Sequence, residues 1–238
     1  IYRYFHEQYL YSLIPNDKKL VIEHYIDKDN KKYVLFHTLF GRRVNDVLSR
    51  ALAFIIGRLQ HRDVEIGIND NGFYLSSTKP IQALRAFELL LKHDLDEIMI
   101  HAIEKTEILK RRFRHCAARA MMILREYKGK RKRVGRQQVS SMILMNAVKR
   151  INPNFCILKE ARREVLEDLM DVDNAKKIID LIKDNKIEVK QVNNDVPSPF
   201  AFNLITQGYS DVMRIEDKIE FIRRMHKEVM ERIGEKIE

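Results

Sequence analysis

The sequence predicts an α+β fold, in which a small antiparallel β-hairpin sheet near the amino end packs with a larger helical bundle. In the first third, short runs of aromatic and β-branched residues come in pairs separated by turn-like residues, as in hairpins. From residue 80 onward, apolar residues recur almost continuously at helical spacing. We therefore expect two subdomains: an α/β one over residues 1–92, with two hairpins and a central helix, and a mainly helical one over residues 93–238.

The first predicted hairpin joins residues 20–26 to residues 32–38 through the sequence DKDNK. The second joins residues 64–68 to residues 73–77, and an Asn-Gly pair in its turn tolerates positive φ. Between the hairpins, apolar residues at helical spacing predict a helix over about residues 44–60, which begins near Asn45-Asp46.

The rest of the chain follows a helical pattern with few interruptions. One helix should extend to a stop at Gly129, because apolar residues from Leu109 to Tyr127 fall on one face. The later pattern gives, in order, a helix from about Arg136, helices at about 157–169 and 173–184, a strand at 187–192 and a helix at about 215–234. The sequence VPSPFAFNL breaks the pattern as a rigid loop, where Phe200 and Phe202 either anchor the loop in a core or stack on bases.

The positive charge is concentrated in one stretch. The 44 Lys and Arg residues exceed the 34 Asp and Glu residues by +10, and residues 110–136 hold twelve cations against the single carboxylate of Glu126. The remainder of the chain is therefore nearly neutral. A localised basic stretch on a balanced background indicates a specific anionic partner, with nucleic acid first and an anionic membrane surface second.

Several classes of protein are excluded by simple features. No apolar run approaches the roughly 20 residues that cross a bilayer, and no signal peptide opens the chain, so we expect a cytoplasmic protein without a membrane partner. Cys116 and Cys156 are widely spaced among apolar neighbours, which supports neither a disulfide nor a zinc site and predicts two buried thiols. The chain begins at Ile1 in an aromatic segment, which suggests a fragment of a longer polypeptide.

Five strings in order carry a family resemblance: LFGRRVND (39–46), RRFRHCAARAMMILR (111–125), GRQQV (135–139), PSPFAFNLITQGYSDV (197–212) and EDKIEFIRRMH (216–226). Together they resemble the carboxy-terminal DEAD/H-associated region of Lhr-type (large helicase-related) ATP-dependent helicases, especially archaeal members. The resemblance implies an accessory module that follows two RecA-like motor domains and a winged helix, in a superfamily-two translocase acting on DNA or RNA:DNA hybrids.

The chemistry of ATP hydrolysis is absent from this sequence. It contains no G-x-x-x-x-G-K-[ST] phosphate loop and no acidic D-E-x-[DH] box for Mg²⁺. We therefore expect no catalytic residue, no metal site and no cofactor in this fragment, and we expect ATP and Mg²⁺ in the motor domains of the parent helicase. The partners implied are single-stranded or tailed-duplex DNA, an RNA:DNA hybrid, and the protein's own RecA and winged-helix domains.

The candidate site is a nucleic-acid grip built from the basic stretch. Each cation that neutralises a phosphate releases counterions, and Arg adds bidentate contacts and stacking on bases. Two further arginines precede the helix over 44–60, where a helix start favours phosphate. The predicted contacts are Arg42, Arg43, Arg111, Arg114, His115, Arg119, Lys128, Lys130, Arg131, Lys132, Arg133, Arg136 and Gln137.

Competing interpretations remain for these residues. The basic face could be solvated, with its arginines paired to acidic helices, and Arg42 and Arg43 could brace the first hairpin. The module could instead bind protein, with its basic face docked on the motor domains or on an acidic partner. Adjacent His115 and Cys116 point about 100° apart on a helix, which disfavours a shared metal. Recombinase and nuclease activities are the weakest alternatives, since no ligand cluster for a metal pair is visible.

Overall fold

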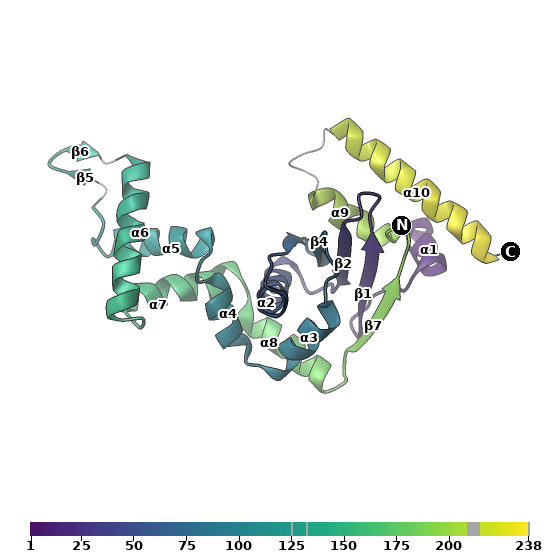
Figure 1. Cartoon of the computed structure of the whole chain (residues 1–238), viewed down its shortest axis with the longest axis horizontal. Helices are drawn as coiled ribbons and strands as arrows, with labels where there is room; N and C mark the ends of the chain where they lie inside the picture. Colours follow the sequence, from purple (N-terminus) through teal and green to yellow (C-terminus); the bar gives the residue numbers. More distant parts are fainter. Residues whose placement is uncertain (125, 132, 209–214, 238) are drawn as a thin grey trace. The chain divides into compact units, whose positions relative to one another are not determined.

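The computed structural model describes residues 1–124, 126–131, 133–208 and 215–237 (Figure 1). The chain forms two compact units: unit 1 comprises Ile1–His93 and Asn174–Glu238, and unit 2 comprises Asp94–Asp173. This division differs from the predicted subdomains, because the last quarter of the chain, from Asn174 onward, returns to the amino-terminal unit. The return is made by a strand, β7, that pairs with the first strand of the chain.

Unit 1 is a mixed sheet with helices on both faces. In chain order its elements are α1 (Tyr2–Tyr11), β1 (Lys19–Ile26), β2 (Lys32–His37), α2 (Arg42–Gln60), β3 (Glu65–Ile68), β4 (Gly72–Ser77), α3 (Ala83–Lys92), most of α8 (Val172–Lys183), β7 (Glu188–Asn193), the 3₁₀ turn η2 (Pro199–Ala201), α9 (Phe202–Gly208) and α10 (Ile215–Ile237). Unit 2 contains α4 (Leu95–Ile103), α5 (Glu107–Arg119), β5 (Glu126–Tyr127), β6 (Lys130–Arg131), α6 (Val134–Ile151), α7 (Cys156–Arg163) and the π-helical turn η1 (Glu164–Leu169).

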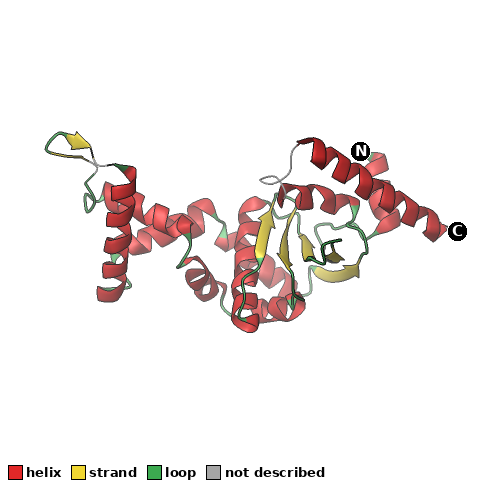
Figure 2. Ribbon diagram, turned by 45° about the horizontal axis from the view of Figure 1, so that its top comes forward, coloured by secondary structure: helices red, strands yellow, loops and turns green. Residues whose placement is uncertain are grey.

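The five-stranded sheet, whose strands are yellow in Figure 2, has the order β3-β4-β2-β1-β7. Both predicted hairpins are confirmed: β1 pairs antiparallel with β2, and β3 pairs antiparallel with β4. The expectation of a purely antiparallel sheet is wrong, because β7 lies parallel to β1, with Glu188 opposite Lys19. A parallel partner arrives through a long crossover and leaves no turn signal beside it in the sequence. The α+β fold class itself is confirmed.

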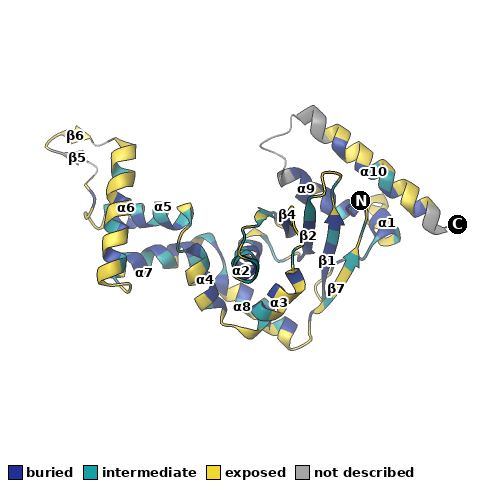
Figure 3. Ribbon diagram, in the orientation of Figure 1, coloured by how far each residue is buried: buried dark blue, intermediate teal, exposed yellow. Residues whose placement is uncertain are grey.

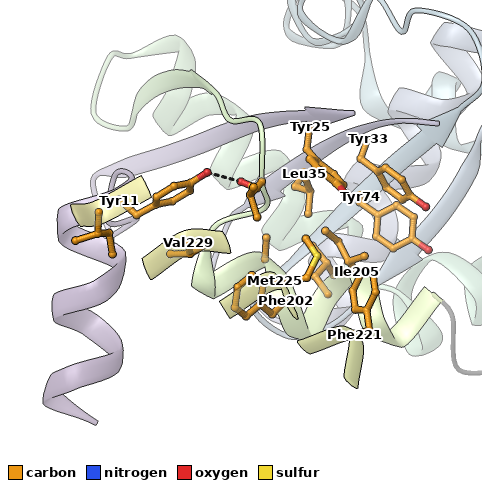
Figure 4. Close-up of a cluster of buried hydrophobic side chains, with 14 residues drawn as sticks. Tyr11, Tyr25, Tyr33, Leu35, Tyr74, Phe202, Ile205, Phe221, Met225 and Val229 are labelled. Carbon is orange, nitrogen blue, oxygen red and sulfur yellow. Dashed lines mark hydrogen bonds between the residues drawn. The ribbon is translucent and has the colours of Figure 1, made fainter. Parts of the chain in front are cut away.

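Successive residues of the central strands face opposite sides of the sheet. On one side, Phe36 of β2 stacks on Phe73 at 4.5 Å between ring centroids and lies 6.2 Å from Phe87 of α3. On the other side, Tyr25, Tyr33 and Leu35 join a cluster contributed by α1, α9 and α10 (Figure 4). The two central strands are therefore almost completely buried (Figure 3).

Residues 197–202, which we call the PSPF segment, are anchored in unit 1 by contacts at both ends. Phe202 is buried in the cluster of Figure 4, and Phe200 stacks on Tyr4 of α1 at 4.9 Å. Ser198 donates hydrogen bonds from its backbone N–H and its hydroxyl to the carboxylate of Glu23, at 2.7 and 2.6 Å. These contacts confirm the anchoring interpretation of the two phenylalanines. The predicted rigid loop is a 3₁₀ turn followed directly by a helix.

The second hairpin contains a glycine for a reason other than the expected positive φ. Gly72 is the first residue of β4, and a Cβ atom there would collide with the backbone oxygen of Phe36. The helix predicted over about residues 44–60 is α2, which begins two residues earlier, after the N-cap residue Gly41. The side chain of Asn45 bonds to the backbone oxygens of Asn69 and Asp70. Asn45 thus ties the helix to the β3–β4 turn.

Two expectations about unit 2 are also corrected. The helix predicted to reach Tyr127 ends at Arg119, and Met121 adopts a left-handed φ of 57° directly after it. Cys116 is buried as expected, but Cys156 is exposed, because α7 buries Leu158 and Ala161 instead. Within the described residues, no helix combines the length and the apolar character that crossing a membrane requires.

Candidate nucleic-acid interface

Helix α5 presents a basic face because its opposite face is committed to the core. Thr106 caps the helix by accepting the backbone N–H of Leu109 at 3.4 Å. The residues buried by the helix are Leu109, Phe113, Cys116 and Ala117. Helical periodicity then leaves Arg111, Arg114 and His115 exposed or half-buried on the other side. The predicted amphipathic arrangement of this segment is confirmed up to residue 119.

A short β-hairpin follows α5, in the segment where the sequence predicted a helix that stops at Gly129. β5 and β6 pair with Glu126 opposite Arg131, and the turn residues Lys128 and Gly129 have φ values of 51° and 70°. Two successive positive φ values are typical of the type I′ turn, which suits the twist of a two-residue hairpin. The hairpin therefore holds the exposed Lys130 and Arg131 in defined positions.

Side chains from α5, the hairpin and the start of α6 line one hollow, which we call the basic hollow. Its volume is about 640 Å³, and its lining residues are Arg114, His115, Ala118, Arg131, Arg133, Val134 and Gln137. Five of these belong to the predicted contact residues. Among the residues that the structure describes, none of those lining the basic hollow is Asp or Glu, and none forms an ion pair with Arg114, Arg131 or Arg133. Arg114, Arg131 and Arg133 thus line one hollow without a close ion pair to another described residue.

The start of α6 adds to the positive potential of the basic hollow. Arg133 is the N-cap residue and makes no side-chain capping hydrogen bond, and its carbonyl accepts the first intrahelical bond, from Gln137 at 3.2 Å. The backbone N–H groups of the first turn therefore have no partner within the helix. Such groups carry the positive end of the helix dipole and favour anions.

Arg119 serves the structure as well as the surface. It donates to a carboxylate oxygen of Glu164, while Arg112 lies 3.6 Å from the other oxygen. The hydrogen bond from Arg119 holds the pKa of Glu164 below its ordinary value. For Arg119 the alternative interpretation of the basic face therefore holds, in which an arginine pairs with a carboxylate of another helix. Its contact with Glu164 joins α5 to η1.

The thiol of Cys116 gives no sign of catalytic activation. Burial raises its pKa above the ordinary value, and the Glu164 carboxylate raises it further. A reactive thiol requires the opposite shift. Among the described residues, no group of three or more His, Cys, Asp or Glu side chains is placed to hold a metal ion.

The remaining predicted residues lie outside the basic hollow. Arg111 lines a neighbouring groove, Lys128 and Lys130 are exposed on the hairpin, and Arg136 is exposed in the first turn of α6. Lys132 lies outside the described residues.

Arg42 and Arg43 belong to unit 1, where they are the exposed first two residues of α2. The backbone N–H of Arg42 donates to the carboxylate of Asp70 at 3.3 Å, and the N–H of Gly41 donates to the Asp70 carbonyl at 3.1 Å. A carboxylate therefore already occupies the anion-binding position at this helix start. This arrangement favours the bracing interpretation of the two arginines over a phosphate contact.

The structure also forms a groove in which two predicted contact residues, Arg111 and Arg114, lie beside residues that the sequence did not single out. A groove of about 340 Å³ between α5 and α6 is lined by Glu107, Ile108, Lys110, Arg111, Arg114, Gln138, Ser141, Met142 and Met145. The spacing of the last four, at i, i+3, i+4 and i+7, was the available sign that they share a face of α6. Nothing in the sequence indicated that α5 would lie opposite that face.

Comparison with known proteins identifies the region. Residues 14–201 match the family model described as DEAD/H associated. The ATP-dependent helicase Lhr-Core of Methanothermobacter thermautotrophicus is 52% identical over 233 residues, which cover 98% of this chain and 27% of that protein. Lhr-Core of Sulfolobus acidocaldarius is 41% identical over 97% of this chain and 27% of its own length. The chain therefore spans about a quarter of these relatives.

One solved structure agrees with the sequence comparison. It is the Mycobacterium smegmatis helicase Lhr bound to ssDNA and AMP-PNP, which superimposes with a TM-score of 0.72 at 26% identity. The match covers 85% of this chain and 26% of that one. The chain thus belongs to the DEAD/H associated family and corresponds to the region of that name in the larger Lhr-type helicases.

Proposed function

We propose that this chain is a nucleic-acid-binding accessory module of a superfamily-two ATP-dependent helicase, which grips one strand by its phosphates in the basic hollow. The observation that carries the proposal is that Arg114, Arg131 and Arg133, from three separate segments, line one hollow whose described lining includes no carboxylate. A surface that only provides solubility would mix both charge signs. The M. smegmatis helicase Lhr was solved bound to ssDNA, which supports single-stranded DNA as the ligand class.

The module's part in the reaction is to hold the strand and not to make or break bonds. RecA-like motor domains elsewhere in the full-length protein would bind ATP and Mg²⁺ and step along the strand, because this sequence has no phosphate loop of its own. A grip that keeps the strand bound between steps raises the number of steps taken before dissociation. Its partners are then single-stranded or tailed-duplex DNA, or an RNA:DNA hybrid, together with the RecA and winged-helix domains, in the cytoplasm.

A second candidate function is protein binding, and a different surface favours it. Val139 and Ile143 of α6 are 57% and 65% exposed, and they lie one turn apart on the same face. Contiguous exposed apolar patches mark interaction sites on soluble proteins, and these two side chains form part of such a surface. Such a module would bind the motor domains or an acidic partner and show little affinity for a polynucleotide.

The experiment that separates these functions is a salt titration of binding to labelled single-stranded DNA, followed by fluorescence anisotropy. The test variant is Arg114→Ala/Arg131→Ala/Arg133→Ala. The control, Lys79→Ala/Lys92→Ala/Lys159→Ala, removes the same charge from exposed residues outside the basic hollow. Because each neutralised phosphate contributes about 0.7 to the log–log salt slope on single strands, the test variant should lose about two units of slope and the control almost none. Equal slopes in the two variants would refute the proposal, and absence of binding at low salt would favour the protein-binding function.

A further inference from the structure

We propose that the groove between α5 and α6 receives an unpaired nucleobase of the same strand whose phosphates lie in the basic hollow, so that the module selects single-stranded over duplex DNA. This inference rests on the proposed function and adds that the groove recognises an unpaired base of the bound strand. The groove volume of about 340 Å³ falls within the roughly 300–1,000 Å³ typical of ligand pockets.

The groove and the basic hollow are joined through one residue. Arg114 lines both of them, and it is half-buried in the middle of α5. A strand with a phosphate against Arg114 therefore has an attached base within reach of the groove.

The lining of the groove suits a flat heteroaromatic ring. Ile108, Met142 and Met145 supply an apolar surface, and methionine thioethers make favourable contacts with aromatic rings. Gln138 and Ser141 can each donate and accept a hydrogen bond, which matches the mixed donors and acceptors at the edge of a base. An apolar surface with a few polar groups is the usual composition of a site that orients a ring.

The charges at the groove favour a base over a phosphate. Glu107 belongs to the lining, and Lys110 lies 2.6 Å from its carboxylate, so these two charges offset one another. A phosphate placed there would face a carboxylate. Arg111 and Arg114 form no ion pair within the described residues, and their planar guanidinium groups can stack on a base. A base inside a duplex is stacked and paired, so it cannot enter the groove.

The test compares two labelled oligonucleotides of equal length, oligo(dT) and a strand made of abasic nucleotides, on the 238-residue chain. Both carry the same phosphates, so the salt slope should be the same for both. The abasic strand should bind about tenfold more weakly, as expected for the loss of base stacking. For a duplex of the same length, the groove should add nothing to the affinity, because paired bases cannot enter it.

A protein variant tests the same contact from the side of the protein, so that two proteins are compared on two oligonucleotides. Gln138→Ala/Met142→Ala should bind oligo(dT) about tenfold more weakly and should no longer distinguish it from the abasic strand. Gln138 is exposed and Met142 is 49% exposed, so the fold should persist, which an unchanged thermal midpoint would verify.

Two outcomes overturn the inference, and they are distinguishable. If the unmodified chain binds both oligonucleotides equally and with a steep salt slope, the groove takes no base, while the phosphate grip stands. If the chain binds neither oligonucleotide at low salt, the proposed function fails together with the groove.

Discussion

Glu23 is a completely buried carboxylate in the middle of β1. It accepts hydrogen bonds from both donors of Ser198 and lies 2.8 Å from Nε2 of His37. Burial raises the pKa of Glu23, but the contacts with His37 and Ser198 outweigh this effect and hold the pKa below its ordinary value of 4.5. The carboxylate thus joins β1 and β2 to the PSPF segment, far along the chain.

We predict that Glu23→Ala lowers the free energy of unfolding by about 3–5 kcal/mol, because it leaves buried donors without their acceptor. Urea unfolding measures the change. Because the pKa of Glu23 is lower in the folded state, its contribution is fully present above pH 4.5 and is lost as the pH falls through the folded-state value. Glu65→Ala is the control: Glu65 pairs with Lys31 while 68% exposed, so its loss should cost about 0–1 kcal/mol. Equal costs for both variants would contradict this account.

Arg119 and Arg133 carry the same charge in the same basic stretch but should behave in opposite ways. Arg133→Ala should reduce the salt slope of single-strand binding by about 0.7 with little effect on unfolding, since it removes one phosphate contact. Arg119→Ala should lower the urea midpoint and leave the salt slope unchanged, because Arg119 is bonded to Glu164. Salt titrations and urea unfolding of both variants check this. A reduced slope for Arg119→Ala would move that residue back into the interface.

At the scale of elements, the hairpin β5–β6 shows where local patterns mislead. Leu124 and Tyr127 continue the helical spacing of α5, so periodicity alone extended the helix. The left-handed Met121 interrupts it, and Leu124 is 43% exposed. The two true hairpins of unit 1 were predictable, since each places strand-forming residues on both sides of a polar turn. In β5–β6 the strands have two residues each, too few for such a pattern.

The turn of this hairpin gives an element-scale prediction. Gly129→Ala should weaken single-strand binding several-fold, because a residue with a Cβ atom is strained at a φ of 70° and Arg131 would no longer be held at the basic hollow. Gly129→Asn should retain binding, since Asn tolerates positive φ. Anisotropy with both variants tests the idea. Equal affinities for the two would show that the hairpin's conformation does not matter for binding.

At the scale of the whole molecule, unit 1 is closed by the end of the chain. Helix α10 contributes Phe221, Met225 and Val229 to the cluster over the sheet (Figure 4), and Tyr11 of α1 donates to the Val196 carbonyl at 2.8 Å. The sequence predicted β7 and α10 as elements. It could not predict that they join the amino-terminal hairpins, because such long-range pairing depends on the whole core and not on local pattern.

This closure predicts a contrast between two adjacent residues. Val229→Asp should strongly lower the urea midpoint, because Val229 is completely buried and the new carboxylate would have no partner. Met230→Asp should change the midpoint little, since Met230 is 38% exposed. Similar midpoints for the two variants would show that α10 does not cover the sheet.

As with the fold, the local features of the candidate site were predictable from the sequence, and the contacts between distant segments were not. The concentration of cations in residues 110–136 was visible in the sequence, because charge is a local property. The sequence did not show which of those cations share a hollow, because three different elements bring Arg114, Arg131 and Arg133 together. Arg119 and Arg112 carry the same charge, and only the position of Glu164 assigns them to the brace.

The most direct measurement is photo-crosslinking of the chain to single-stranded DNA that contains 4-thiothymidine, with the crosslinked peptides located by mass spectrometry. The account predicts crosslinks in α5, in the β5–β6 hairpin and in the first half of α6, and their loss in high salt. Crosslinks confined to unit 1, or unchanged by the Arg114→Ala/Arg131→Ala/Arg133→Ala substitutions, would contradict the claim that the basic hollow grips the strand.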